Sequence, residues 1–135
     1  MNTNMKTTID NDKKRILVVD DQPQNTRLLK LYLEQTNKYV VKEENNARTA
    51  HSTAEEFQPH LILLDVMMPG IGGGELAAGF QASAKLKGVP IVFLTSAVTK
   101  QEVDAGGGQL GGFPFLAKPV VLAEVLACLQ RHLGQ

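Results

Sequence analysis

The 135-residue sequence predicts an α/β fold in which helices cover both faces of a parallel sheet, a three-layer sandwich. Short apolar runs alternate five times with longer segments of helical periodicity, and the connections between them are short. Runs that are apolar throughout, such as ILVV and LILL, are typical of strands buried on both faces. We therefore expect a doubly wound, five-stranded sheet of order 2-1-3-4-5, whose winding reverses between its first and third strands.

The elements of the first half of the chain follow from their apolar patterns. Residues 15–19 form a β-branched run that predicts the first strand, and residues 39–42 predict a weaker second one. Between them, apolar residues recur at helical spacing up to about residue 35: Leu28, Leu29, Leu31, Tyr32 and Leu33. Residues 46–57 carry a narrow apolar stripe that indicates a second helix, and Pro59 stops it before the third strand at 61–64.

The second half repeats the alternation with weaker helices. An Ala-rich helix is expected over about 74–86, interrupted by Gly79, and a fourth strand from 90 or 91 to 94. A weak helix from about residue 100 runs into GGGQLGG, and the segment FPFLAKP supplies the fifth strand. The last helix is expected from 120 to about 132, ending at Gly134. Its inward positions are expected to be Val121, Val125, Ala127, Cys128 and Leu129.

Composition limits the classes of function. Fourteen basic and 14 acidic side chains leave the formal net charge near zero, so neither nucleic acid nor an acidic membrane surface is an expected partner. The polar amino-terminal segment lacks the apolar stretch that a secretory signal needs, and no segment approaches the length of a membrane span, so we expect a cytoplasmic protein. One domain is expected over residues 15–133, after a polar tail over 1–14 that we expect to be disordered.

Polar side chains end four of the predicted strands. Asp20 and Asp21 follow the first strand and Asp65 the third, while Thr95 and Lys118 close the fourth and fifth. Ligands of open α/β sheets bind at the carboxyl ends of the strands where the winding reverses, so these five side chains are expected to converge. Taken singly, an aspartate after a strand is more often a helix cap or a turn former, and a lysine is more often exposed to solvent.

Three converging carboxylates repel one another unless a cation neutralises them. Two like charges at about 4 Å repel by about 4 kcal/mol at an effective dielectric near 20. Oxygen ligands without histidine or cysteine suit a hard ion, and Mg²⁺ fits best because it retains water and gathers phosphate oxygens. One carboxylate is then expected to act as a nucleophile that forms an acyl phosphate, with the Lys118 ammonium and the Thr95 hydroxyl on the phosphate oxygens.

The segments LVVDD, ILLDVMMPG, IVFLTSA and FLAKP resemble, in order and spacing, the signatures of the receiver domain of two-component response regulators. The resemblance covers about residues 15–133 and implies a flavodoxin-like (βα)5 fold. It implies that Asp65 accepts a phosphoryl group from the phosphohistidine of a sensor histidine kinase or a phosphotransfer protein. It also implies that Asp21, Asp65 and the main-chain carbonyl of Met67 bind Mg²⁺ directly, and that Asp20 acts through water.

The same resemblance implies a switch and an output. Thr95 matches the residue that supplies the hydroxyl of the family's switch. Phe115 stands at the position of the switch aromatic residue but has no hydroxyl. Lys118 matches the lysine that contacts the phosphate, and the peptide bond from this lysine to the following proline, here Pro119, is typically cis in the family. The chain stops soon after the fifth helix, so we expect a single-domain response regulator of a phosphorelay with no fused effector. Its output is expected through a surface of the fourth helix, fifth strand and fifth helix, towards a downstream protein that the sequence does not identify.

Other readings stay open beside this one. A vestigial receiver could act as a protein-interaction module. A Mg²⁺-dependent phosphohydrolase of the haloacid dehalogenase type is less favoured, because Met67 stands where that family needs a second aspartate. Under the receiver interpretation we expect the chain to catalyse only its own phosphorylation and dephosphorylation, and so not to be an enzyme acting on other substrates.

Residues 106–111 match the pattern GxGxxG, but the match precedes a strand instead of following one. We therefore expect a flexible connection there rather than a dinucleotide site.

Overall fold

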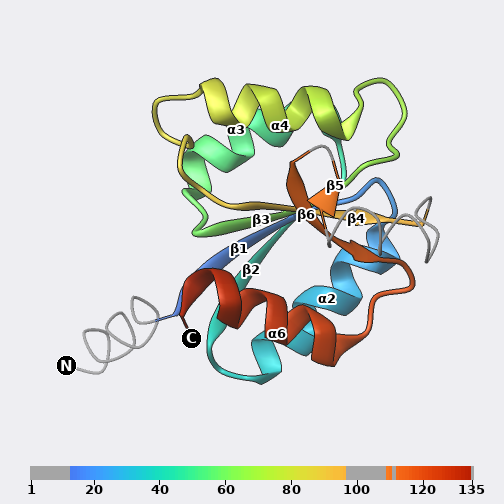
Figure 1. Ribbon diagram of the computed structural model, residues 1–135, viewed down its shortest axis with the longest axis vertical. Coiled ribbons are helices and arrows are strands. Elements are labelled where there is room, and N and C mark those ends of the chain that lie inside the picture. Colours follow the sequence, from blue (N-terminus) through green and yellow to red (C-terminus); the bar gives the residue numbers. More distant parts are fainter. Residues whose placement is uncertain (1–12, 97–108, 111, 135) are drawn as a thin grey trace.

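The computed structural model describes residues 13–96, 109–110 and 112–134, which form a sheet between two helix layers (Figure 1). The strands are β1 (Lys14–Val19), β2 (Tyr39–Glu44), β3 (Leu61–Asp65), β4 (Ile91–Thr95), β5 (Gln109–Leu110) and β6 (Phe113–Ala117). The described helices are α2 (Pro23–Gln35), α3 (Ala47–Phe57), α4 (Gly73–Ala82) and α6 (Leu122–Leu133). The α/β alternation expected from the sequence is confirmed for the described part of the chain.

The sheet has the order β2-β1-β3-β4-β6-β5. Its five long strands are parallel, which confirms the predicted flavodoxin-like order 2-1-3-4-5. The two-residue strand β5 was not predicted; it pairs antiparallel with β6 and extends the sheet at that edge. The helix expected from about residue 100 lies outside the described residues, as do residues 1–12 of the expected tail and most of the GxGxxG segment.

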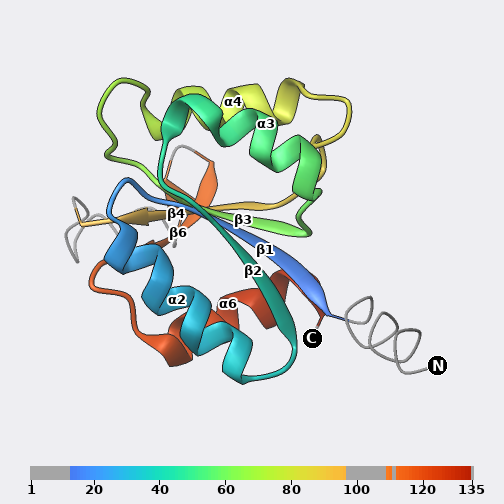
Figure 2. The same ribbon diagram turned by 180° about the vertical axis from the view of Figure 1, so that it is seen from behind.

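Two apolar cores lie on opposite faces of the sheet. Helices α3 and α4 cover one face and α2 and α6 the other, as Figures 1 and 2 show from opposite sides. Alternate side chains of β1 enter alternate cores: Leu17 and Val19 face α3 and α4, while Ile16 and Val18 face α2 and α6. All four are fully buried, as expected for a central parallel strand.

Three helices differ in detail from their expected patterns. In α2, Leu29 and Leu33 are buried, but Leu28, Leu31 and Tyr32 are 46%, 53% and 38% exposed. Helical spacing places residues 29 and 33 on one face, and only that face meets the sheet. In α6, Val125, Cys128 and Leu129 are buried as expected, whereas the expectation for Val121 and Ala127 was wrong. Val121 precedes the helix as its N-cap, and Ala127 lies on the exposed face.

Helix α4 ends at Ala82 rather than near residue 86. Ser83 takes an extended backbone conformation, with ψ of 131°. Its hydroxyl donates a hydrogen bond to the Glu55 carboxylate at 2.8 Å and accepts one from the Lys85 N–H at 3.2 Å. The hydrogen bonds of a serine side chain to neighbouring groups compete with the backbone hydrogen bonds that would continue the helix.

Among the described residues, no helix is both long enough and apolar enough to cross a membrane.

His60 joins the start of β3 to β1. The Nδ1 of its imidazole accepts a hydrogen bond from the backbone N–H of Arg15 at 2.9 Å, and the backbone N–H of His60 donates to the Arg15 carbonyl at 2.7 Å. Partial burial, followed by the positive charges of Arg15 and Lys14, lowers the pKa of His60 below its ordinary 6.5. The folded protein therefore favours the neutral imidazole, in which Nδ1 can accept.

We expect the stability of the domain to fall as the imidazole of His60 becomes protonated. The imidazole of His60 titrates near pH 6.5 in the unfolded chain and at a lower pH in the folded chain. The stabilisation is therefore fully present above pH 6.5 and is lost as the pH falls from 6.5 through the lower pKa of the folded state. Denaturant unfolding between about pH 8 and pH 5 measures this. His60→Asn keeps an acceptor that does not titrate, so its stability should depend less on pH. An equal pH dependence in both proteins would contradict this role for His60.

Candidate functional site

The register of three parallel strand pairs brings the predicted polar residues to one edge of the sheet. Val19 of β1 is paired with Leu64 of β3, so Asp20 and Asp65 follow neighbouring strand positions. Asp65 is in turn paired with Leu94 of β4, one residue before Thr95. Thr95 is paired with Ala117 of β6, and Lys118 follows. The convergence predicted from the strand ends is therefore confirmed.

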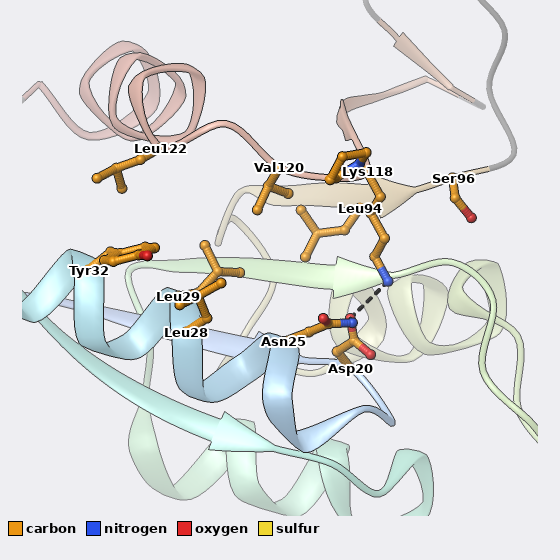
Figure 3. Close-up of a pocket in the computed structure, with 11 residues that line it drawn as sticks. Asp20, Asn25, Leu28, Leu29, Tyr32, Leu94, Ser96, Lys118, Val120 and Leu122 are labelled. Carbon is orange, nitrogen blue, oxygen red and sulfur yellow. Dashed lines mark hydrogen bonds and ion pairs between the residues drawn. The ribbon is translucent and has the colours of Figure 1, made fainter.

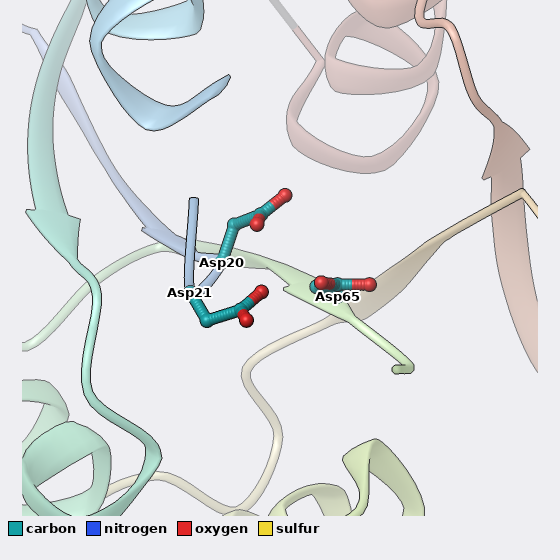
Figure 4. Close-up of side chains that lie close together, drawn as sticks. All are labelled: Asp20, Asp21 and Asp65. Carbon is teal, nitrogen blue, oxygen red and sulfur yellow. The ribbon is translucent and has the colours of Figure 1, made fainter. Parts of the chain in front are cut away.

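Asp20, Asp21 and Asp65 form a compact carboxylate cluster. One carboxylate oxygen of each residue lies within 4.8 Å of the other two. The side chains extend from the ends of β1 and β3 towards a common space (Figure 4). Asp20 is fully buried and Asp65 is 4% exposed, whereas Asp21 is half-buried. An all-oxygen set of this kind, with a net negative charge, fits a hard divalent cation such as Mg²⁺.

Lys118 connects two of these carboxylates. Its Nζ lies 2.9 Å from Oδ2 of Asp20 (Figure 3). The same Nζ lies 3.4 Å from Oδ1 of Asp65. Its backbone N–H donates to the Thr95 carbonyl at 2.8 Å, which fixes the lysine beside the end of β4. The Lys118–Pro119 peptide bond is cis, as the family resemblance implies.

Hydrogen bonds from the start of α2 hold Asp20. Its Oδ1 accepts from the Gln22 N–H at 2.9 Å, and its Oδ2 accepts from Nδ2 of Asn25 at 3.3 Å. The side-chain amide of Asn45 donates to the backbone carbonyl of Asp20 at 2.8 Å. Sequence reasoning missed both asparagines. Asn25 stands five residues after Asp20 in the first turn of a helix, and no periodic pattern distinguishes it.

The surroundings change the pKa values of the titratable groups. Burial, the largest effect, raises the pKa of Asp65 above its ordinary value. The hydrogen bond from the Met67 N–H lowers this pKa, the negative charge of Asp20 raises it, and Lys118 lowers it. Burial acts to lower the pKa of Lys118, but its hydrogen bond with Asp20 and its attraction to both carboxylates outweigh burial, and the net shift is upward. The ammonium thus stays charged and neutralises part of the cluster.

The remaining predicted residues surround this cluster. Thr95 is 1% exposed at the end of β4. Met67 donates its N–H to Oδ1 of Asp65 at 3.1 Å, which places its backbone next to the cluster, while its side chain is 65% exposed. Phe115 of β6 is half-buried and packs against the core under α3 and α4. These positions agree with the expected roles without testing them.

Comparison with known families gives one extensive match. The family model described as "Response regulator receiver domain" matches residues 16–130. The transcriptional regulatory protein ResD of Bacillus subtilis is 38% identical over 124 residues, which are 89% of this chain and 50% of that protein. Protein PilH of Pseudomonas aeruginosa is 32% identical over 107 residues, 78% of this chain and 86% of PilH. The chain spans about half the length of ResD and of several other curated relatives.

Solved structures of receiver domains and related response regulators have the same fold as this chain. The chemotaxis protein CheY4 of Vibrio cholerae superposes with a TM-score of 0.76 at 28% identity, over 90% of this chain and 99% of that one. The receiver domain of the sensor histidine kinase PA1611 from Pseudomonas aeruginosa PAO1 gives 0.76 at 27% identity, over 91% and 99%. In that structure a magnesium ion is coordinated in the active site cleft.

We expect Asp21→Asn to stabilise the protein without Mg²⁺ and to weaken its response to Mg²⁺. The change removes one of three mutually repelling charges, so unfolding free energy should rise on the order of 1 kcal/mol in EDTA. The parent should gain about 2.7 kcal/mol when Mg²⁺ is present at a hundred times its dissociation constant, and the variant should gain much less. Thermal unfolding with and without Mg²⁺ measures both effects.

Glu56→Gln is the matched control, because Glu56 is an exposed carboxylate on α3 outside the cluster. It should stay within about 0.5 kcal/mol of the parent in both conditions. An Asp21→Asn protein that is less stable than the parent in EDTA, yet gains as much from Mg²⁺, would show that the three carboxylates do not share an ion.

Proposed function

The chain belongs to the family of response regulator receiver domains, and on that premise we propose that it is a single-domain response regulator that accepts a phosphoryl group on Asp65. The donor is the phosphohistidine of a sensor histidine kinase or of a phosphotransfer protein. The observation that carries this proposal is the contact of one ammonium, that of Lys118, with both Asp20 and Asp65 inside the carboxylate cluster.

Asp65 is well placed to act as the nucleophile. Its Oδ1 accepts the Met67 N–H and faces Lys118, so we assign Oδ2 as the attacking oxygen. The new O–P bond forms as the P–N bond of phosphohistidine breaks, the imidazole leaves with the electron pair, and an acyl phosphate results. Burial of Asp65 keeps bulk water away from the acceptor oxygen.

The neighbouring residues take complementary roles. Asp21, Asp65 and the main-chain carbonyl of Met67 would hold Mg²⁺, with Asp20 acting through water; the ion, when bound, neutralises charge on the transferring phosphoryl group. Lys118 moves its ammonium from the Asp20 contact towards a phosphoryl oxygen, because phosphorylation adds negative charge at Asp65. The Thr95 hydroxyl binds another phosphoryl oxygen.

We propose that phosphorylation changes the surface at the edge of the sheet beyond Thr95, and that this surface transmits the signal. Phe115 lies on β6, two residues before the position paired with Thr95, and is half-buried, so it can repack when Thr95 turns towards a phosphoryl group. The responding surface that we propose comprises β6 and α6 together with the helix expected from about residue 100, which lies outside the described residues. Its partner is a downstream protein.

Incubation with Mg²⁺ and acetyl phosphate tests the proposal. Intact-mass measurement should show one phosphoryl group per chain in the parent and in Glu56→Gln, and none in Asp65→Asn, because only Asp65 supplies the acceptor oxygen. Hydroxylamine should remove the label, since it cleaves acyl phosphates. Release of many phosphates per chain would indicate a phosphohydrolase, and the absence of any label or response to beryllofluoride would indicate an interaction module; either result would contradict the proposal.

A further inference from the structure

The carboxylate of Asp21 differs from the other two of the cluster in how it is held. Asp20 and Asp65 each accept a backbone N–H, and both contact the Lys118 ammonium. Asp21 is half-buried, and within the described part of the chain no hydrogen bond or ion pair holds its side chain. Repulsion from the other two carboxylates favours orientations of Asp21 that point into solvent. Its place in the cluster therefore depends on the backbone that carries it.

The backbone on either side of Asp20 is held by the segment at the end of β2. The Asp20 N–H donates to the Glu44 carbonyl at 3.1 Å, and the Asp20 carbonyl accepts from Nδ2 of Asn45 at 2.8 Å. The carbonyl belongs to the peptide unit that joins Asp20 to Asp21, and a peptide unit is planar. The bond from Asn45 therefore also sets the direction in which the chain enters Asp21.

Thr26 holds the amide of Asn45 in place. Nδ2 of Asn45 donates its second N–H to Oγ1 of Thr26 at 3.0 Å, and the Thr26 hydroxyl donates to Oε1 of Glu43 at 2.7 Å. The Pro23 carbonyl, at 3.1 Å, is a more distant acceptor for the same hydroxyl. Because a backbone carbonyl can only accept, the nitrogen of the Asn45 amide must face Asp20. Thr26 is fully buried, so its hydroxyl depends on these partners.

Asn45 and Thr26 act on the backbone rather than on the carboxylates. The side chain of Asp20 lies at one end of a cavity of about 350 Å³ between α2 and the segment that leads into α6, which Leu28 and Tyr32 also line (Figure 3). Groups of α2 and of that segment bind the Asp20 carboxylate. Among the described contacts, neither Asn45 nor Thr26 donates to a carboxylate of the cluster.

We propose that Asn45 and Thr26 are positioning residues for the cation. They hold the peptide unit between Asp20 and Asp21, and so keep the Asp21 carboxylate directed at the cluster. This inference rests on the proposed function, in which Asp21 binds Mg²⁺. Neither residue touches the cation or changes the charge of the site. Residues that orient metal ligands typically contribute roughly 10- to 100-fold to metal affinity.

Magnesium titration of the full chain by calorimetry, without phosphodonor, tests this inference. Asn45→Ala removes the amide and Thr26→Val removes the hydroxyl, and neither substitution changes the charge of the chain. Each should weaken Mg²⁺ binding roughly tenfold, because Asp21 must then be drawn back from solvent when the cation binds. Thr26→Ser keeps the hydroxyl and should bind within about twofold of the parent. Thermal unfolding establishes that each variant is folded.

Asn46→Ala is the matched control, since it changes the neighbouring asparagine. The side chain of Asn46 caps α3 by accepting the Arg48 N–H at 2.9 Å. Loss of this cap should lower the unfolding temperature but leave the affinity for Mg²⁺ unchanged. An equal loss of affinity in Asn46→Ala and Asn45→Ala would show a general effect of stability and would overturn the inference.

The amide signal of Asp21 gives a second measurement that does not need the cation. Without Mg²⁺, its chemical shift should change in Asn45→Ala and stay the same in Asn46→Ala. Parent affinity for Mg²⁺ in both Asn45→Ala and Thr26→Val would overturn the inference and leave phosphorylation of Asp65 unaffected. A parent that binds Mg²⁺ but takes up no phosphoryl group would instead contradict the proposed function alone, and a parent that binds no Mg²⁺ would overturn both.

Discussion

The parallel pairing of β1 with β3 is the constraint on which the site depends. Because Val19 is paired with Leu64, the two strands end at the same level, and Asp20 and Asp65 emerge side by side into a space that water barely reaches. A shift of one residue in this register would direct one carboxylate to the other face of the sheet. The apolar side chains of β1 and β3, fully buried in the cores on both sides, hold the register against the repulsion between the carboxylates.

The protein stabilises these like charges with groups from distant parts of the chain. The Gln22 N–H and the Asn25 amide at the start of α2 bind Asp20, the Met67 N–H binds Asp65, and Lys118 contacts both carboxylates. Burial nevertheless raises the pKa of Asp65, so the Met67 N–H and Lys118 do not fully offset the loss of hydration at this carboxylate. A site that is held together but keeps excess negative charge is suited to take up a cation, and through it an anionic phosphoryl group.

Lys118 links this site to the surface around it. Its side chain contacts two carboxylates, its backbone N–H is bound by the Thr95 carbonyl, and the residues that follow it enter α6 along the cavity beside α2. A change of charge at Asp65 therefore acts directly on the residue that borders both β4 and the cavity.

Sequence alone determined the strand and helix alternation, the sheet order and the polar residues at the strand ends, because these follow from local periodicity and from the rule that parallel strands present their carboxyl ends together. Tertiary structure decided the rest. That Asn25 binds Asp20, that Ser83 ends α4 through Glu55, and that Leu28 and Tyr32 face a cavity rather than a core all depend on contacts between distant segments. Helical spacing predicts which apolar residues share one face of a helix, but only the packing of neighbouring elements determines whether that face is buried.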